Sequence, residues 1–89
     1  MERLWDVDPS ARFARRLGRT AAELEVSRVN DDCPEIWELD NGDVAVVGRD
    51  ATELFHDRLP EGLRVGNDER LVVIPGSMLR SAKKDITDA

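Results

Sequence analysis

Glu35-Ile-Trp-Glu-Leu-Asp-Asn-Gly-Asp-Val-Ala-Val-Val47 is the stretch that decides the fold. Two runs of strand-forming residues flank Asn41-Gly42, the dipeptide that best tolerates the positive φ angles of a two-residue hairpin turn. The stretch therefore predicts a β-hairpin. Its register pairs three apolar residues of the first strand with three valines of the second: Leu39 with Val44, Trp37 with Val46, and Ile36 with Val47.

The same register divides the hairpin into two faces, because successive side chains of a strand point to opposite sides. The first face carries large apolar side chains, which are Trp37, Leu39, Val44 and Val46. The second face carries Ile36, Glu38, Ala45 and Val47. We predict that the first face is the core face, because its cross-strand apolar pairs stabilise the sheet when they are buried.

A third strand is predicted nearer the C-terminus, at residues 70–74. Leu71-Val-Val-Ile74 places four apolar residues in succession, three of them β-branched, which is typical of a strand covered on both faces. Pro75 ends the run. Together with the hairpin 35–47, this strand predicts a small antiparallel three-stranded sheet.

An N-terminal helix is predicted after Asp8-Pro9, a dipeptide that favours a helix start. Apolar residues then recur at spacings of three and four, at positions Phe13, Leu17, Ala21 and Leu24. Gly18 is a possible end for a first helix, and Thr20-Ala-Ala-Glu23 is a capping box that can start a second. We favour one helix with a weak point at Gly18.

Two short helices complete the prediction. Asp50-Ala-Thr-Glu53 has the pattern of a capping box and predicts a helix that runs to about Leu59. Ser77 predicts the start of a last helix that ends near Lys84. The fold class is therefore α+β, with residues 1–89 forming a single small domain in which an N-terminal helix and two short helices pack on the sheet.

The charge balance constrains the partners of this 89-residue chain. Its formal net charge is −6 and its pI is near 4.7, which disfavours direct binding of nucleic acid and favours a protein partner. No run reaches about 18 apolar residues and no secretory signal is visible, so no membrane partner is expected. Cys33 is the single cysteine, which fits the reducing cytoplasm. Eleven of the 13 basic residues are arginine, as in proteins of high-GC bacteria.

The sequence offers few groups for chemistry. His56 is the single histidine, and it has no recognisable nucleophile and orienting partner. Asp32 precedes Cys33, and a neighbouring carboxylate suppresses the thiolate form of a thiol. One cysteine and one histidine do not supply the ligands of a zinc site. We predict no catalytic residue, no metal site, no cofactor and no enzymatic activity.

Five residues are candidates for contacts with a partner. Four arginines cluster near the N-terminus and either form a solvated face or bind an anion or an acidic partner, namely Arg12, Arg15, Arg16 and Arg19. Trp37 is predicted to pack in the core; were it exposed, it would be a natural interface anchor.

Three segments resemble the core pattern of small actinobacterial proteins related to the developmental regulator BldB. They are Cys33-Pro-Glu35-Ile-Trp-Glu-Leu39, Asn41-Gly42-Asp43-Val-Ala-Val46 and Arg49-Asp50. The resemblance covers roughly Cys33 to Ala82. It implies a non-enzymatic, often self-associating regulatory protein, commonly encoded beside a helix-turn-helix repressor, with some members proposed as antitoxin-like partners. The chain departs from the family pattern in its last helix, where residues 78–82 contain no aromatic side chain.

These observations favour a cytoplasmic, non-enzymatic regulatory or protein-interaction module. Its expected partner is a transcription regulator of the helix-turn-helix class, and a homodimer through a free sheet edge is plausible. One alternative is an antitoxin or immunity-type inhibitor that masks a basic protein surface. A second alternative is a small ligand-binding domain.

Overall fold

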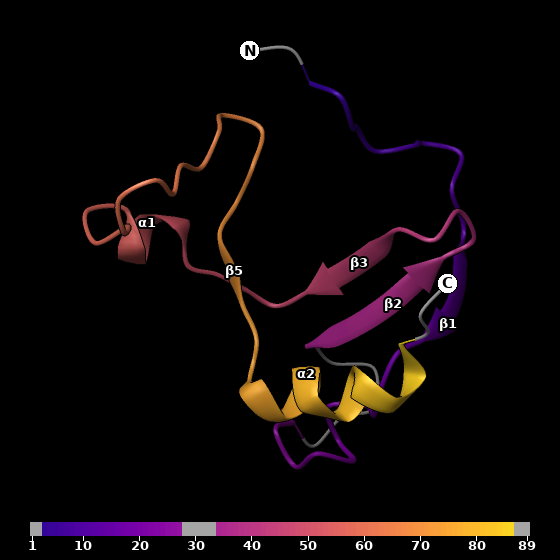
Figure 1. The fold of residues 1–89 in the computed structure, drawn as a ribbon. Helices are drawn as coiled ribbons and strands as arrows, with labels where there is room; N and C mark the ends of the chain where they lie inside the picture. The colour runs from indigo at the N-terminus through magenta and orange to yellow at the C-terminus, as the bar shows by residue number, and fades with distance from the viewer. Residues whose placement is uncertain (1–2, 28–33, 87–89) are drawn as a thin grey trace.

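A computed structural model describes residues 3–27 and 34–86 of the chain. Figure 1 shows short strands and helices joined by long loops. In chain order the elements are β1 (Phe13–Arg16), β2 (Glu35–Leu39), β3 (Val44–Val47), β4 (Arg49–Asp50), α1 (Thr52–Phe55), β5 (Val72–Val73), α2 (Gly76–Ala82) and the 3-10 helix η1 (Lys83–Asp85).

The predicted α+β class and the three-stranded antiparallel sheet are confirmed, but the third strand was assigned wrongly. The sheet has the order β1-β2-β3, so its third member is Phe13–Arg16. The predicted strand 70–74 is reduced to Val72–Val73, which pairs with Arg49–Asp50 in a separate two-stranded ladder. After β3 the chain continues through β4 to α1, and it returns through β5 to α2 (Figure 1).

The hairpin forms between the predicted strands, but its turn has three loop residues instead of two. The Leu39 N–H donates to the Asp43 carbonyl at 2.8 Å, and the Gly42 N–H donates to the Leu39 carbonyl at 3.0 Å. Gly42 is the one residue of the loop 40–42 with a positive φ, +91°. This is the type I turn with a glycine bulge that is the next most common hairpin loop.

The longer loop shifts the register by one residue and corrects the predicted faces. Ile36 pairs with Val46, and Trp37 pairs with Ala45. A shift of one residue exchanges the two faces of one strand relative to the other. Ile36 is therefore the buried residue of β2, with 4% of its surface exposed, whereas Trp37 lies on the opposite face and is half-buried.

The predicted N-terminal helix is absent from residues 3–27, where two local features replace it. The strand β1 ends at Arg16. Leu17 comes next, and Gly18 then turns the chain with a φ of +78°. The predicted capping box then forms, because Thr20 and Glu23 exchange backbone-to-side-chain hydrogen bonds of 2.9 and 3.1 Å. The helical turn ends at once in a Schellman motif, in which Glu25 has a φ of +60° and the Val26 N–H donates to the Ala21 carbonyl.

The two predicted short helices are present, and the first of them is shorter than expected. α1 begins at Thr52 and ends at Phe55, four residues before the predicted end. Asp50 is the last residue of β4 and accepts a hydrogen bond from the Thr52 N–H at 3.1 Å. α2 begins at Gly76, and its last turn tightens into η1 (Lys83–Asp85).

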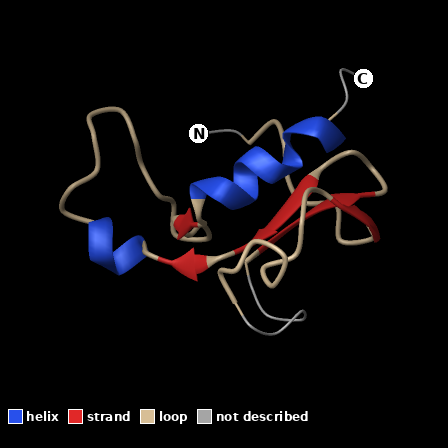
Figure 2. Cartoon of the chain, turned by 90° about the horizontal axis from the view of Figure 1, so that it is seen from below, coloured by secondary structure: helices blue, strands red, loops and turns tan. Residues whose placement is uncertain are grey.

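The core lies between α2 and one face of the three-stranded sheet (Figure 2). It consists of five buried side chains, which are Leu17, Ala21, Ile36, Met78 and Ala82. Met78, at 0% exposure, is its largest fully buried side chain. Helix α2 approaches closely because residue 18 is glycine: a Cβ there would meet the Ser81 Oγ and lie 2.8 Å from the Ala82 nitrogen.

Replacing Gly18 by alanine tests this close approach. We expect Gly18→Ala to reduce the free energy of unfolding by about 2–4 kcal/mol, because the left-handed backbone is strained and the new methyl group contacts α2. Gly62→Ala is the matched control, since Gly62 has a φ of +91° and free space around it; it should cost about 1–2 kcal/mol. Urea denaturation measures both changes. Equal losses in the free energy of unfolding for Gly18→Ala and Gly62→Ala would contradict the packing role of Gly18.

Candidate functional site

The four candidate arginines do not form one surface. Their segment is a strand and not a helix, so Arg15 and Arg16 point to opposite faces of the sheet. Arg12 lies beside the hairpin loop, where its N–H donates to the Asp40 carboxylate at 3.0 Å. Arg19 lies after Gly18 and approaches α2, where its N–H donates to the Ser81 hydroxyl at 3.2 Å.

Arg15 is part of the contact between the sheet and the end of the chain. Its Nε donates to Glu38 at 2.9 Å on β2, and its terminal nitrogen donates to the Asp85 carbonyl at 2.6 Å. Both hydrogen bonds lie on the face of the sheet that carries α2. Arg15 therefore ties the 3-10 helix to the sheet, which is a structural role.

Trp37 is the centre of a polar and aromatic cluster on the other face of the sheet. Its indole N–H donates to the Glu35 carboxylate at 2.6 Å, and the Arg16 guanidinium donates to the same oxygen at 2.7 Å. The Arg16 guanidinium also lies 4.9 Å from the Trp37 ring centroid. Phe13 packs edge-on against Trp37 with the ring centroids 6.0 Å apart. The prediction that Trp37 joins the main core is wrong.

An apolar groove of about 370 Å³ runs between α2 and the β2–β3 hairpin. Its lining is apolar except for Glu38, and it includes side chains of β3 and of the C-terminal helices that are about half exposed. These are Val44 at 53%, Val46 at 45%, Leu79 at 58% and Ile86 at 58% exposure. Sequence reasoning missed this groove because it predicts that Val44 and Val46 are buried, whereas the structure leaves both about half exposed on the side of the sheet that carries α2.

The outer edge of β3 continues the apolar groove. The Leu39-to-Asp43 hydrogen bond fixes the alternation of the ladder, so the backbone groups of Ala45 and Val47 point to β2. Those of Val44 and Val46 point away from β2, and β3 is the last strand of its sheet. The edge therefore offers two N–H groups and two carbonyls beside exposed valine side chains.

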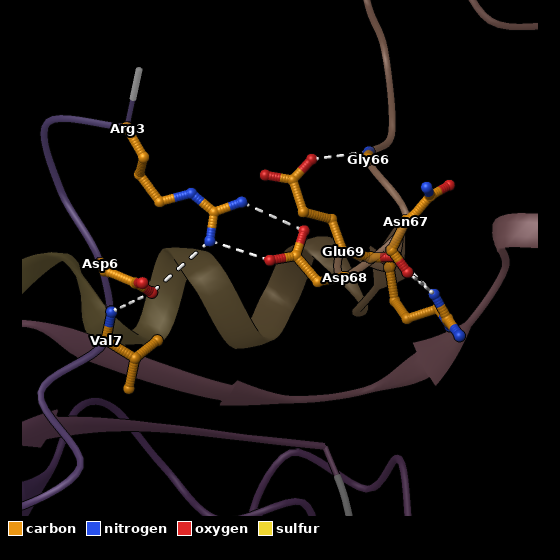
Figure 3. A network of polar contacts seen from close by, with 8 residues as sticks. Arg3, Asp6, Val7, Gly66, Asn67, Asp68 and Glu69 are labelled. Atoms are coloured by element: carbon orange, nitrogen blue, oxygen red, sulfur yellow. Dashed lines mark hydrogen bonds and ion pairs between the residues drawn. The ribbon is translucent and has the colours of Figure 1, made fainter. Parts of the chain in front are cut away.

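The N-terminal arm, residues 3–12, is tied to a distant loop by an exposed ion pair (Figure 3). The Arg3 guanidinium contacts both carboxylate oxygens of Asp68, at 2.8 and 3.1 Å. Further along the arm, the Trp5 indole N–H donates to Asp43 at 3.3 Å. Leu4 and Trp5 remain 93% and 59% exposed, so the arm adds unpartnered apolar surface close to the hairpin loop.

The described residues contain no cluster of side chains arranged to bind a metal ion. His56 is exposed at the end of α1, and Cys33 lies outside the described residues. Within residues 3–27 and 34–86, no group of three His, Cys, Asp or Glu side chains is arranged to hold a metal ion. Among the same residues, no helix has the length and apolar character needed to cross a bilayer.

Comparison of the chain with protein-family models, with curated proteins and with solved structures finds no match.

The Glu35 cluster predicts a dependence of stability on pH. Hydrogen bonds from Trp37 and then from Arg16 lower the pKa of Glu35 below its ordinary value of 4.5. Because the pKa is lower in the folded chain, the stabilisation is complete above the ordinary pKa and is lost as the pH falls through the folded pKa. We expect the free energy of unfolding of the wild type to fall in acid more steeply than that of Glu35→Gln.

At neutral pH, Glu35→Gln should cost about 1–2 kcal/mol, because hydrogen bonds to a charged group are lost. Glu38→Gln is the control, since its ion pair with Arg15 is more exposed, with side-chain exposures of 32% and 42%; it should cost below about 1 kcal/mol. Urea denaturation of the three proteins between neutral pH and acid measures both effects. If the free energies of unfolding of the wild type and of Glu35→Gln fall in parallel with decreasing pH, Glu35 is not the source of the pH dependence.

Proposed function

We propose that this chain is a non-enzymatic, cytoplasmic protein-interaction module that forms a homodimer through β3 and the apolar groove. The supporting observation is the small core. Among the described residues, five side chains form the core cluster, whereas fourteen large hydrophobic side chains are exposed. A chain of this size gains little stability from so small a core, and a partner that covers the groove adds to it.

The two edges of the sheet differ in a way that favours pairing at β3. The edge strand β1 carries Arg15 and Arg16 and has an irregular register between Phe13 and Arg15. Charged residues and bulges are the usual means by which proteins prevent pairing at an edge. β3 has the sequence Val-Ala-Val-Val and regular pairing with β2. The β3 edge therefore lacks both protections.

A second copy fits the β3 edge because antiparallel pairing of identical strands closes a two-fold dimer. With the two-fold axis at Ala45, Val44 of one copy pairs with Val46 of the other. All four backbone groups of the edge are then bonded. A four-residue strand alone buries less than the roughly 1,200 Å² of a stable interface, so the groove beside α2 must contribute Leu79 and Ile86.

The partner class that we propose is a transcription regulator of the helix-turn-helix type. The resemblance of residues 33–50 to BldB-related proteins supports it, since that family is encoded beside such regulators. The net charge of −6 supports a second candidate, an antitoxin or immunity protein that covers a basic surface. Copurification from the source organism separates them: a helix-turn-helix protein supports the first, and a nuclease or other toxin supports the second.

Light scattering of the purified chain tests the homodimer. We expect a solution mass of twice 10.0 kDa for the wild type. Val46→Lys should reduce the mass to that of one chain, because a lysine on an edge strand prevents pairing. Leu63→Lys is the control, since Leu63 is 44% exposed and lies in a loop away from β3; it should remain dimeric. A wild-type monomer at every concentration would overturn the proposal.

The melting temperature gives a second test. Because association stabilises the folded chain by mass action, the melting temperature of the wild type and of Leu63→Lys should rise with protein concentration. That of Val46→Lys should not change. Differential scanning calorimetry over a concentration series measures this, and the same concentration dependence in Val46→Lys would place the interface elsewhere.

A further inference from the structure

Four basic side chains from two separate segments meet on one side of α2. Arg19, Arg80, Lys83 and Lys84 line a shallow hollow of about 510 Å³ together with Ser81. The hydrogen bond from the Arg19 N–H to the Ser81 hydroxyl, 3.2 Å long, joins the two segments. All four basic residues are exposed. We call this surface the basic face.

In the described part of the chain, none of the four cations of the basic face forms an ion pair. Every ion pair found there belongs to another arginine, namely Arg3, Arg15, Arg16 or Arg70. Two carboxylates border the basic face and keep their charge, and one of them, Glu23, attracts the Arg19 guanidinium. Asp85 accepts from the Gly18 N–H at 2.7 Å, and Glu23 accepts from the Thr20 N–H at 2.9 Å.

This arrangement is unusual for the charge of the chain. The chain has 19 acidic and 13 basic residues, so a random patch of four charges contains acidic residues. Four cations that form no ion pair among the described residues outnumber the two bordering carboxylates, Glu23 and Asp85, and this local excess of positive charge attracts anionic groups. Holding them together without a ligand costs electrostatic repulsion, which a bound anion relieves.

The basic face adjoins the apolar groove along the same helix. Leu79 and Lys83 are four residues apart, so they lie on one side of the helical segment, and Ile86 follows directly after its end. Leu79 and Ile86 line the groove, and Lys83 lines the basic face. A ligand on the basic face therefore has exposed apolar side chains within reach.

We propose that the basic face binds a short acidic segment of a protein partner, with apolar residues of that segment contacting Leu79 and Ile86. A nucleic acid is a poorer fit, because an extended polyanion continues beyond the patch onto a surface that is acidic overall. The inference rests on the proposed role as a protein-interaction module. It does not depend on pairing of the β3 edges.

Fluorescence anisotropy with a labelled peptide of alternating glutamate and leucine residues tests the proposal. The control ligands are the same peptide with glutamine in place of glutamate, and a labelled oligothymidylate of equal charge. We expect the acidic peptide to bind best, and its affinity to fall as the salt concentration rises. The glutamine peptide should bind at least tenfold more weakly.

Two double variants with the same change in charge locate the site. Arg80→Gln with Lys84→Gln should weaken peptide binding about tenfold, equivalent to about 1.4 kcal/mol. Arg49→Gln with Arg64→Gln removes two exposed arginines elsewhere and should leave binding unchanged. Equal weakening in both variants, or tighter binding of oligothymidylate than of the acidic peptide, would overturn the proposal.

The homodimer and the acidic ligand are tested separately. Monomeric Val46→Lys should keep the charge-dependent part of peptide binding, and the Arg80/Lys84 variant should keep its dimer mass in light scattering. If the wild type is a monomer that binds the acidic peptide, the homodimer proposal is wrong and the proposal for the basic face is supported. If the wild type is a dimer and neither it nor monomeric Val46→Lys binds the peptide, the proposal for the basic face fails alone.

Discussion

The hydrogen bond from the Leu39 N–H to the Asp43 carbonyl, 2.8 Å long, determines how the rest of the molecule is arranged. It closes a three-residue loop whose bulge at Gly42 sets the register of β2 against β3. The register in turn decides that Ile36 faces α2 and that Trp37 faces away. Because strand side chains alternate, neither assignment changes without the other. The groove, the free edge and the Trp37 cluster all follow from this one loop.

The position of α2 depends on a second local constraint, at Gly18. Its positive φ turns the chain out of β1, and its missing side chain lets the backbone of residues 81–82 approach. The turn that follows is closed at both ends by the Thr20–Glu23 exchange and by the Schellman motif at Glu25. These contacts hold Arg19 beside α2. The basic face is therefore a consequence of the same geometry that completes the core.

Sequence reasoning predicts local chemistry well here and long-range pairing poorly. The hairpin, the Thr20 capping box and both short helices follow from residue types within a few positions. The spacing of Phe13, Leu17 and Ala21 also fits a helix, but Phe13 belongs to a strand because β2 offers a pairing edge that the pattern does not reveal. The basic face was missed for the same reason: Arg19 and Arg80 are brought together by packing. A one-residue error in the turn was sufficient to exchange the predicted core and surface faces of β2.

The two proposed contact surfaces use different physical forces, and this difference has a consequence for regulation. The β3 edge binds through backbone hydrogen bonds and apolar burial, which salt affects little. The basic face binds through exposed charges, which salt screens over about 8 Å at physiological ionic strength. Leu79 and Ile86 line the groove and are close in sequence to Arg80 and Lys84 of the basic face, so a second copy and an acidic segment would both use these two side chains. Occupation of one surface therefore changes the apolar area available to the other, and the two binding events are coupled through α2.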